Sequence, residues 1–160
     1  MAFSSKDKIL SWNHVHWSGL LIIFLLTFLV YSPALNGDFI WDDDLHVTKK
    51  EAVIGKNGLK RIWTTTDAFY YPLVLTTFWV EWRLWGMQPM GYHIVNVAFH
   101  AVNAILLCLL LRRIGIKWSW FAGAIFALHP VHVESVAWIT ELKNVQSGFF
   151  YLLSLLSYLR

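Results

Sequence analysis

The fold is decided by residues 93–111, HIVNVAFHAVNAILLCLLL, an apolar run without a single acidic side chain, lysine or arginine. At about 1.5 Å per residue, a helix over this range is long enough to cross the ~30 Å hydrocarbon core of a bilayer. Arg112 and Arg113 end the run, and cations of this kind gather at the cytoplasmic ends of membrane spans. We therefore predict a membrane-spanning helix over residues 93–111.

Four polar residues interrupt this run at intervals of three, four and three positions: His93, Asn96, His100 and Asn103. At about 100° per residue they share one face of the helix. Polar side chains are costly in lipid, so this face is expected to turn toward other helices or a water-filled cavity. Two interpretations stay open, namely hydrogen bonding between helices and the lining of a functional cavity.

The rest of the chain also has the composition of a membrane protein. Of its 160 residues, 57% are hydrophobic and 14% are charged, whereas soluble domains are about a quarter charged. Further apolar runs predict spans over residues 17–35, 115–129 and 145–160. The sequence therefore predicts an all-α integral membrane protein with about four transmembrane helices. Residues 36–92 form a long first outward loop that carries two surface helices.

The second of these surface helices is bounded by Pro72 and Gly86. Proline favours the first position of a helix, and glycine favours the position just past its end. Four large apolar residues share one face of this helix: Leu75, Phe78, Trp82 and Trp85. Because the helix would be only ~21 Å long, we expect it to lie in the plane of the membrane interface.

The distribution of cations predicts the orientation of the chain in the membrane. One side of the predicted spans receives Lys6, Lys8, Arg112, Arg113, Lys117 and Arg160. We predict that this side is cytoplasmic and includes the amino terminus. The net charge of +3 does not indicate nucleic-acid binding. No Walker loop or GxSxG motif supports nucleotide-driven transport or serine hydrolysis.

A cluster of carboxylates follows the first predicted span, in the sequence Phe39-Ile40-Trp41-Asp42-Asp43-Asp44. Neighbouring carboxylates repel one another, which favours a raised pKa in at least one of them and suits it to proton transfer. The same carboxylates could instead hold a hard divalent cation. The simplest alternative is a solvated acidic turn.

A second polar cluster occupies residues 129–144. If residues 130–142 form one helix, Glu134 and Glu141 lie two turns apart on nearly the same face, while His132 points elsewhere. This placement argues against a zinc site made from this helix alone. The alternatives are an interfacial helix and a polar site shared with the acidic loop. A carboxylate that deprotonates a hydroxyl, together with cations that neutralise a phosphate, would suit transfer from a lipid-linked anionic donor.

Four ordered motifs together resemble a known family. They are NGDFIWDD (36–43), Tyr71-Pro72-Leu73 with Thr77-Phe78, GYHIVNV (91–97) with His100 and Asn103, and HPVHVESVAWI (129–139) with Glu141 and Lys143-Asn144. From about residue 20 to the end, the chain resembles the amino-terminal part of the transmembrane and tetratricopeptide-repeat O-mannosyltransferase-like proteins. These proteins belong to the GT-C superfamily of membrane glycosyltransferases.

The resemblance implies a partial GT-C fold in a polytopic enzyme. Such an enzyme transfers a sugar from a polyprenyl-phosphate carrier to a hydroxyl of a protein or another acceptor. The reaction takes place on the non-cytoplasmic face, which is periplasmic, extracellular or lumenal. A divalent metal ion stays open, because some members of the superfamily need one and others do not.

The resemblance also implies roles for individual residues. Asp42 or Asp43 would be the catalytic carboxylate of the first outward loop, and Glu134 or Glu141 the acidic residue of the next one. His132 and Lys143 would lie near the phosphate. For His93, Asn96, His100 and Asn103, the resemblance favours the lining of a substrate cavity.

Two departures from the family pattern bear on these expectations. Leu142 stands where many relatives carry an arginine, so contact with the phosphate would rest on Lys143 alone. The superfamily also has more spans than the four predicted here, so we expect this chain to be a fragment that is inactive by itself.

Two rival interpretations stay open beside the enzyme. One is a non-enzymatic membrane module that binds a lipid or a protein partner through its aromatic loop and polar stripe. It requires the helix face formed by Leu75, Phe78, Trp82 and Trp85. The other is metal handling through His93, His100, His129 and His132.

Overall fold

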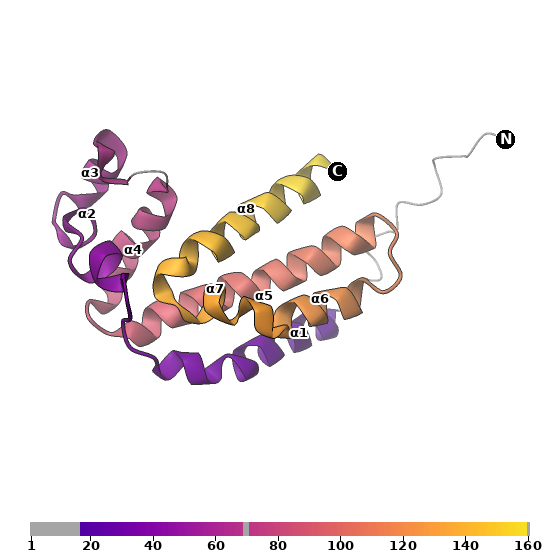
Figure 1. The fold of residues 1–160 in the computed structure, drawn as a ribbon. Coiled ribbons are helices and arrows are strands. Elements are labelled where there is room, and N and C mark those ends of the chain that lie inside the picture. Colours follow the sequence, from indigo (N-terminus) through magenta and orange to yellow (C-terminus); the bar gives the residue numbers. More distant parts are fainter. Residues whose placement is uncertain (1–16, 69–70, 160) are drawn as a thin grey trace.

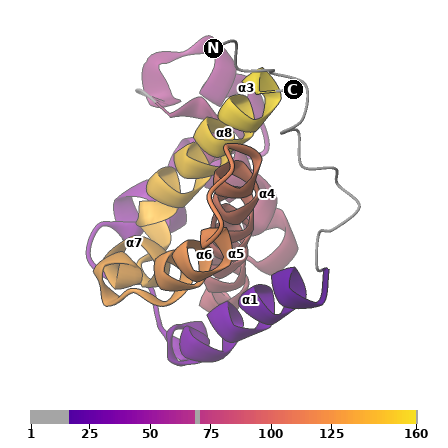
Figure 2. The ribbon, with the colours of Figure 1, turned by 90° about the vertical axis from the view of Figure 1, so that its right-hand side faces the viewer.

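The computed structural model describes residues 17–68 and 71–159, which are helical or irregular and contain no strand. Helix α5 (Pro89–Arg113) is at the centre of the fold. Helices α1 (Trp17–Val30), α6 (Ser119–Leu128) and α8 (Leu142–Tyr158) pack against it (Figure 1). A view turned by 90° again places α5 between α1 and α8 (Figure 2).

Helix α5 confirms the span predicted over residues 93–111 as a helix and extends it at both ends. Within the described part of the chain, it is the one helix that is long and apolar enough to cross a membrane. Helices α1 and α6 have 14 and 10 residues, or about 21 and 15 Å, which is less than the ~30 Å hydrocarbon core. The structure therefore supports one candidate span and does not confirm the predicted four.

The predicted boundaries of the other apolar helices also differ from those observed. Helix α1 ends at Val30, and Pro33 lies in a short 3-10 segment over Ser32–Asn36 that turns the chain toward the acidic loop. Proline cannot donate the backbone hydrogen bond that would continue the helix. Helix α8 begins at Leu142, three residues earlier than predicted.

Three helices gather at the end of the molecule where α5 begins: α2 (Glu51–Ile54), α3 (Gly58–Thr64) and α4 (Pro72–Trp85) (Figure 1). The predicted helix between Pro72 and Gly86 is confirmed. Gly86 has a φ of +55°, a conformation that glycine adopts without steric cost. On α4, Leu75 and Phe78 are buried, and Trp82 and Trp85 pack against the same core.

Four short segments complete the described chain: η3 (Asp44–Thr48), η4 (Thr66–Ala68), η5 (Pro130–His132) and η6 (Ile139–Glu141). The single helix considered over residues 130–142 is wrong, because α7 (Val133–Ala137) is the one α-helix between Pro130 and the start of α8 at Leu142. Trp138 interrupts it with an extended backbone, φ −88° and ψ 123°. Glu134 and Glu141 therefore do not share a helical face.

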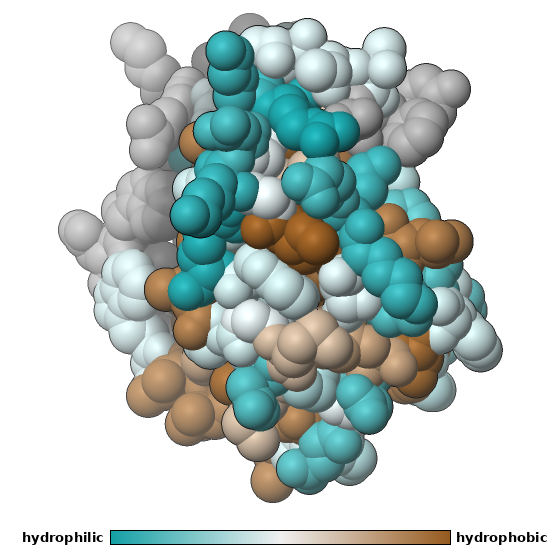
Figure 3. All heavy atoms as spheres, turned by 90° about the vertical axis from the view of Figure 1, so that its left-hand side faces the viewer, coloured by the Kyte–Doolittle hydropathy of each residue, from teal (hydrophilic) through white to brown (hydrophobic). Residues whose placement is uncertain are grey.

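The two ends and the sides of the molecule differ in polarity. Figure 3 looks onto the end that carries α2, α3 and α4, where hydrophilic side chains cover much of the surface. The sides of α1, α6 and α8 instead expose large apolar residues, among them Leu21, Leu25, Leu29, Phe121, Ile125 and Leu153. Arg112 and Arg113 lie in the last turn of α5, at the opposite end. Lys6, Lys8 and Arg160, which the predicted orientation also used, lie outside the described residues.

Candidate functional site

The acidic loop and the segment before α8 meet through the carboxylate of Asp43. This side chain is fully buried. Its Oδ2 accepts a hydrogen bond from the backbone N–H of Ile40 at 2.9 Å. Its Oδ1 accepts from the backbone N–H of Thr140 at 2.9 Å and from the Thr140 hydroxyl. Asp43 thus joins two segments that lie 97 positions apart in the chain.

Asp42 has a different environment from its neighbour. Its side chain is 37% exposed, and its Oδ2 lies 3.5 Å from Nδ1 of His46. Its Oδ1 has no hydrogen-bond partner among the described residues. Asp42 is therefore held by fewer protein donors than Asp43, since its Oδ2 lies near His46 and its Oδ1 is buried without a partner.

Asp44, the third carboxylate, is held in an exposed ion pair. Its Oδ2 lies 2.5 Å from Nζ of Lys49, and its Oδ1 accepts from the Thr48 hydroxyl at 2.7 Å. The hydrogen bonds from Lys49 and Thr48 lower the pKa of Asp44. The three carboxylates thus have separate partners, and they do not form one repulsive cluster that raises the pKa of Asp44.

Trp41 lies directly before Asp42 and has an unusual backbone. Its φ is +49°, and its side chain is 76% exposed. For a residue with a bulky side chain, this conformation costs about 1–2 kcal/mol. The indole packs edge-on against Trp138, with 4.7 Å between the ring centroids. This contact is a second link between the acidic loop and the segment before α8.

On that segment, Glu141 and Lys143 form a pair with 2.6 Å between Oε1 and Nζ. The Asn144 amide also donates to Glu141 Oε2 and reaches the Ser135 hydroxyl. Glu134, in the first turn of α7, is exposed. The structure therefore holds Glu141 through two partners and leaves Glu134 facing outward.

His132 packs against the rings of His100 and Phe126, whose centroids are 5.2 and 4.5 Å from its own. Burial lowers the pKa of His132, and the charge of His129 lowers it further. His132 is therefore neutral at physiological pH.

The polar stripe of α5 connects this helix to α6, to α8 and to the segment before α8. All four residues are 1–2% exposed. The Asn96 amide donates to the carbonyls of Trp138 and Ile139 at 2.9 and 3.3 Å. The Asn103 amide donates to Val145 O at 2.7 Å, and His100 Nε2 lies 3.1 Å from Ala127 O. His93 packs against Gly37, where an added Cβ would come within 3.0 Å of Nε2. Asn96, His100 and Asn103 thus join α5 to its neighbours by hydrogen bonds, whereas both ring nitrogens of His93 are buried without a hydrogen-bond partner among the described residues. Contact of these residues with a substrate stays a prediction.

We expect the Asn96 bonds to contribute measurably to stability. Asn96→Ala leaves the Trp138 and Ile139 carbonyls without this donor, which lowers the free energy of unfolding by about 1–3 kcal/mol. Thermal unfolding of the detergent-solubilised protein measures this change. The matched control is Asn57→Ala at an exposed position, with an expected change within about 0.5 kcal/mol. Equal stability of Asn96→Ala and the wild type would contradict the assigned role.

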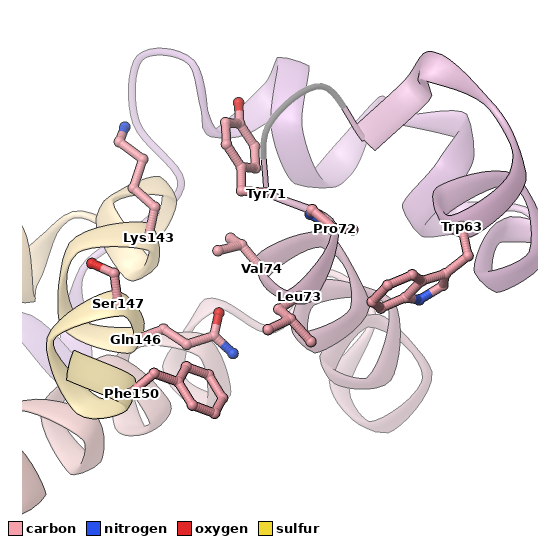
Figure 4. Close-up of a pocket in the computed structure, with 9 residues that line it drawn as sticks. All are labelled: Trp63, Tyr71, Pro72, Leu73, Val74, Lys143, Gln146, Ser147 and Phe150. Atoms are coloured by element: carbon pink, nitrogen blue, oxygen red, sulfur yellow. The ribbon is translucent and has the colours of Figure 1, made fainter. Parts of the chain in front are cut away.

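A cleft of about 440 Å³ lies between α4 and α8. Figure 4 shows its lining residues: Trp63, Tyr71, Pro72, Leu73, Val74, Lys143, Gln146, Ser147 and Phe150. The Lys143 ammonium and the Tyr71 hydroxyl point toward the same side, whereas Leu73 and Phe150 lie lower in the view (Figure 4). The cleft is therefore apolar along most of its length and carries a cation at one side.

Two residues of interest carried no assigned role from the sequence. Thr140 gives no local signal, because its partner Asp43 is distant in the chain. Glu81 gives one, since it follows Phe78 by three positions on the apolar face of α4. Both of its carboxylate oxygens are buried without a hydrogen-bond partner in the described ranges, and burial raises its pKa to about 8.

The described residues do not fit a divalent cation by themselves. Within residues 17–68 and 71–159, no three side chains of His, Cys, Asp or Glu are grouped so that they could hold a metal ion. Both Asp43 oxygens accept hydrogen bonds from protein donors, and Asp44 is paired with Lys49. His100 and His132 are neighbours, but His93 lies apart against Gly37.

Curated proteins resemble this chain, whereas no protein-family model and no solved structure matches it. It is 33% identical to Protein O-mannosyl-transferase Tmtc1 of Drosophila melanogaster, over 92% of this chain and 19% of that protein. It is 29% identical to Protein O-mannosyl-transferase F38B6.6 of Caenorhabditis elegans, over 88% of this chain and 23% of the relative. It is 30% identical to Protein O-mannosyl-transferase TMTC2 of Homo sapiens, over 88% of this chain and 18% of the relative.

By class, this helical chain is a homologue of protein O-mannosyl-transferases. More narrowly, it is homologous to a segment of the TMTC O-mannosyl-transferases, which confirms the resemblance read from its four motifs. The chain spans about a fifth of the length of the curated relatives it matches.

Proposed function

We propose that this chain is part of a membrane glycosyltransferase that moves a sugar from a polyprenyl-phosphate carrier to a protein hydroxyl. The names of its relatives favour mannose as the sugar. The observation that carries the proposal is the hydrogen-bonded contact between Asp43 and Thr140, here called the join. This join brings the Trp41–Asp42 segment against the segment that holds Trp138, Glu141 and Lys143.

Asp42 is the general base of the proposed reaction. As the acceptor oxygen forms a bond with the anomeric carbon of the sugar, the bond from that carbon to the phosphate oxygen breaks. The hydroxyl proton passes to the Asp42 carboxylate, and the phosphate leaves with its carrier. A base positioned in this way acts within hydrogen-bond reach of the hydroxyl.

The cleft between α4 and α8 suits an amphiphilic donor. Lys143 lies at its polar side, where an ammonium can neutralise a phosphate, and Leu73 and Phe150 offer an apolar surface to a hydrocarbon chain. In the same proposal Glu134, which is exposed in the first turn of α7, is the second acid. Neutral His132 would serve as a hydrogen-bonding group for the phosphate.

The proposed site faces the non-cytoplasmic side of the membrane. The acidic loop lies at the end where α5 begins, whereas Arg112 and Arg113 lie at the other end of that helix. Cations at a helix end favour the cytoplasmic side. The amino terminus would then be cytoplasmic, and the acceptor would be a protein on the periplasmic, extracellular or lumenal side.

The structure bears on the rival interpretation as a non-enzymatic module. That interpretation has a lipid or a partner bind the aromatic loop and the polar stripe, and it predicts that the α4 face formed by Leu75, Phe78, Trp82 and Trp85 is indispensable. Leu75 and Phe78 are each 1% exposed, and both tryptophans pack against the same core. This face is therefore used inside the protein.

The proposal is tested with the full-length gene product in proteoliposomes. The donors are radiolabelled mannose on a polyprenyl phosphate and, in parallel, mannose on a nucleotide, with a serine- and threonine-rich protein as acceptor. We expect label on the acceptor from the polyprenyl donor alone, and alkaline β-elimination releases this label, as it does for a sugar linked to a serine or threonine hydroxyl. Transfer from the nucleotide sugar, or no transfer from either donor, would overturn the proposed function.

A further inference from the structure

Thr140 occupies the point where the two outward segments meet. Its side chain is 3% exposed, and it lies in the short η6 turn between the fully buried Ile139 and Glu141, which holds Lys143. Its backbone N–H and its hydroxyl both donate to the same oxygen of Asp43. The η6 turn therefore holds the acidic loop on one side and the Glu141–Lys143 pair on the other.

Asp43, which Thr140 holds, also restrains the turn formed by residues 40–43. Its Oδ2 accepts from the Ile40 N–H at 2.9 Å, while its own N–H donates to Ile40 O at 3.0 Å. These two bonds close the loop around Trp41 and Asp42. A strained backbone such as that of Trp41 persists only where the surroundings fix it more than once. The Asp43 carboxylate, held from Thr140, is such a restraint.

We propose that Thr140 is a positioning residue, which sets the place of the Asp42 carboxylate by fixing Asp43 and, through it, the strained turn at Trp41. The role rests on the proposed function, in which Asp42 receives the acceptor proton. Misplacement of a reacting group by about 1 Å can lower a rate by about 100-fold. A hydroxyl that does not touch the substrate can therefore have a large effect on kcat.

The test compares Thr140→Val with Thr140→Ser in the full-length gene product. Valine keeps the β-branched shape and the backbone N–H but removes the hydroxyl donor, whereas serine keeps that donor. We expect Thr140→Val to lower kcat by about 10–100-fold with little change in the KM for donor or acceptor. Thr140→Ser is expected to keep most of the wild-type rate.

A matched control separates this role from general stability. Thr27 is also fully buried, and its hydroxyl donates to Ile23 O within α1 at 2.8 Å. Thr27→Val is expected to change the unfolding temperature without lowering kcat per folded molecule. If Thr140 has only a structural role, Thr140→Val behaves in the same way, and the proposal is wrong.

A double variant tests whether Thr140 acts through Asp42. In an Asp42→Asn background, Thr140→Val is expected to change the residual rate by less than about threefold, because coupled residues are not additive. A second loss as large as in the wild type would overturn the positioning role. Full activity of Asp42→Asn would instead overturn the proposed base, and absence of transfer by the wild-type protein would overturn both proposals.

Discussion

Asp42→Asn is expected to lower the kcat of sugar transfer by about 10²–10⁴-fold, the usual contribution of a general base. Asparagine keeps the size of the side chain but does not accept the hydroxyl proton. Because Asp42 makes no hydrogen bond to the segment before α8, the join through Asp43 and Thr140 is expected to remain intact. The measurement is the rate of mannose transfer from the polyprenyl donor in proteoliposomes, normalised to folded protein.

Asp44→Asn is the matched control on the same loop. The Asp44 carboxylate is engaged by Lys49 and Thr48 in an exposed pair. Exposed ion pairs contribute little, so we expect transfer within about threefold of the wild-type rate. Equal loss in both variants would show that the loop needs its total negative charge, which would contradict a specific base at Asp42.

The contribution of Glu81 to the stability of the protein is expected to fall as the pH rises. Burial raises the pKa of this carboxyl from 4.5 to about 8. The folded state therefore keeps a proton that the unfolded state releases between these two pKa values. The stabilisation is fully present below pH 4.5 and is lost as the pH rises toward 8.

The size of the effect follows from the two pKa values. Each pH unit between them changes the free energy of unfolding by about 1.4 kcal/mol, so the loss from about pH 5 to about pH 8 approaches 4 kcal/mol. In Glu81→Gln the side chain is neutral at every pH, and this part of the pH dependence disappears. Unfolding of the detergent-solubilised protein at pH values from about 5 to about 8 measures both.

Glu51→Gln provides the comparison for an exposed carboxyl. Its pH dependence is expected to match that of the wild type, because an exposed carboxylate stays solvated in both states. If Glu81→Gln keeps the full pH dependence of the wild type, the buried carboxyl is not its source. Another group would then carry the pH dependence.

Residues that lie close together in the sequence were enough to predict helices α4 and α5. Pro72 and Gly86 bound α4 as predicted, and the spacing of Leu75 and Phe78 identified its buried face. The uncharged run ending at Arg112 identified α5. In each case the preference resides in neighbouring residues, whose positions the sequence shows directly.

Contacts between distant segments explain what the sequence did not reveal. The Asn96 amide donates a hydrogen bond to the carbonyl of Trp138, which lies 42 positions further along the chain. Trp138 is also the residue whose extended backbone interrupts the helix considered over residues 130–142. The sequence also presented Asp42 and Asp43 as equivalent candidates. They differ because Thr140, which is 97 positions from Asp43, donates to that carboxylate alone.

The close pair of Glu141 and Lys143 changes how an anionic head group could bind at this end of the molecule. The ammonium already has a carboxylate 2.6 Å away, and Leu142 between them supplies no second cation. Capture of a phosphate at Lys143 would therefore be an exchange of partners, in which Glu141 keeps its hydrogen bond from Asn144 and releases the lysine. The affinity for the head group would then depend on the difference in free energy between the Lys143–phosphate pair and the Lys143–Glu141 pair. It would not reflect the full attraction of an unpaired cation.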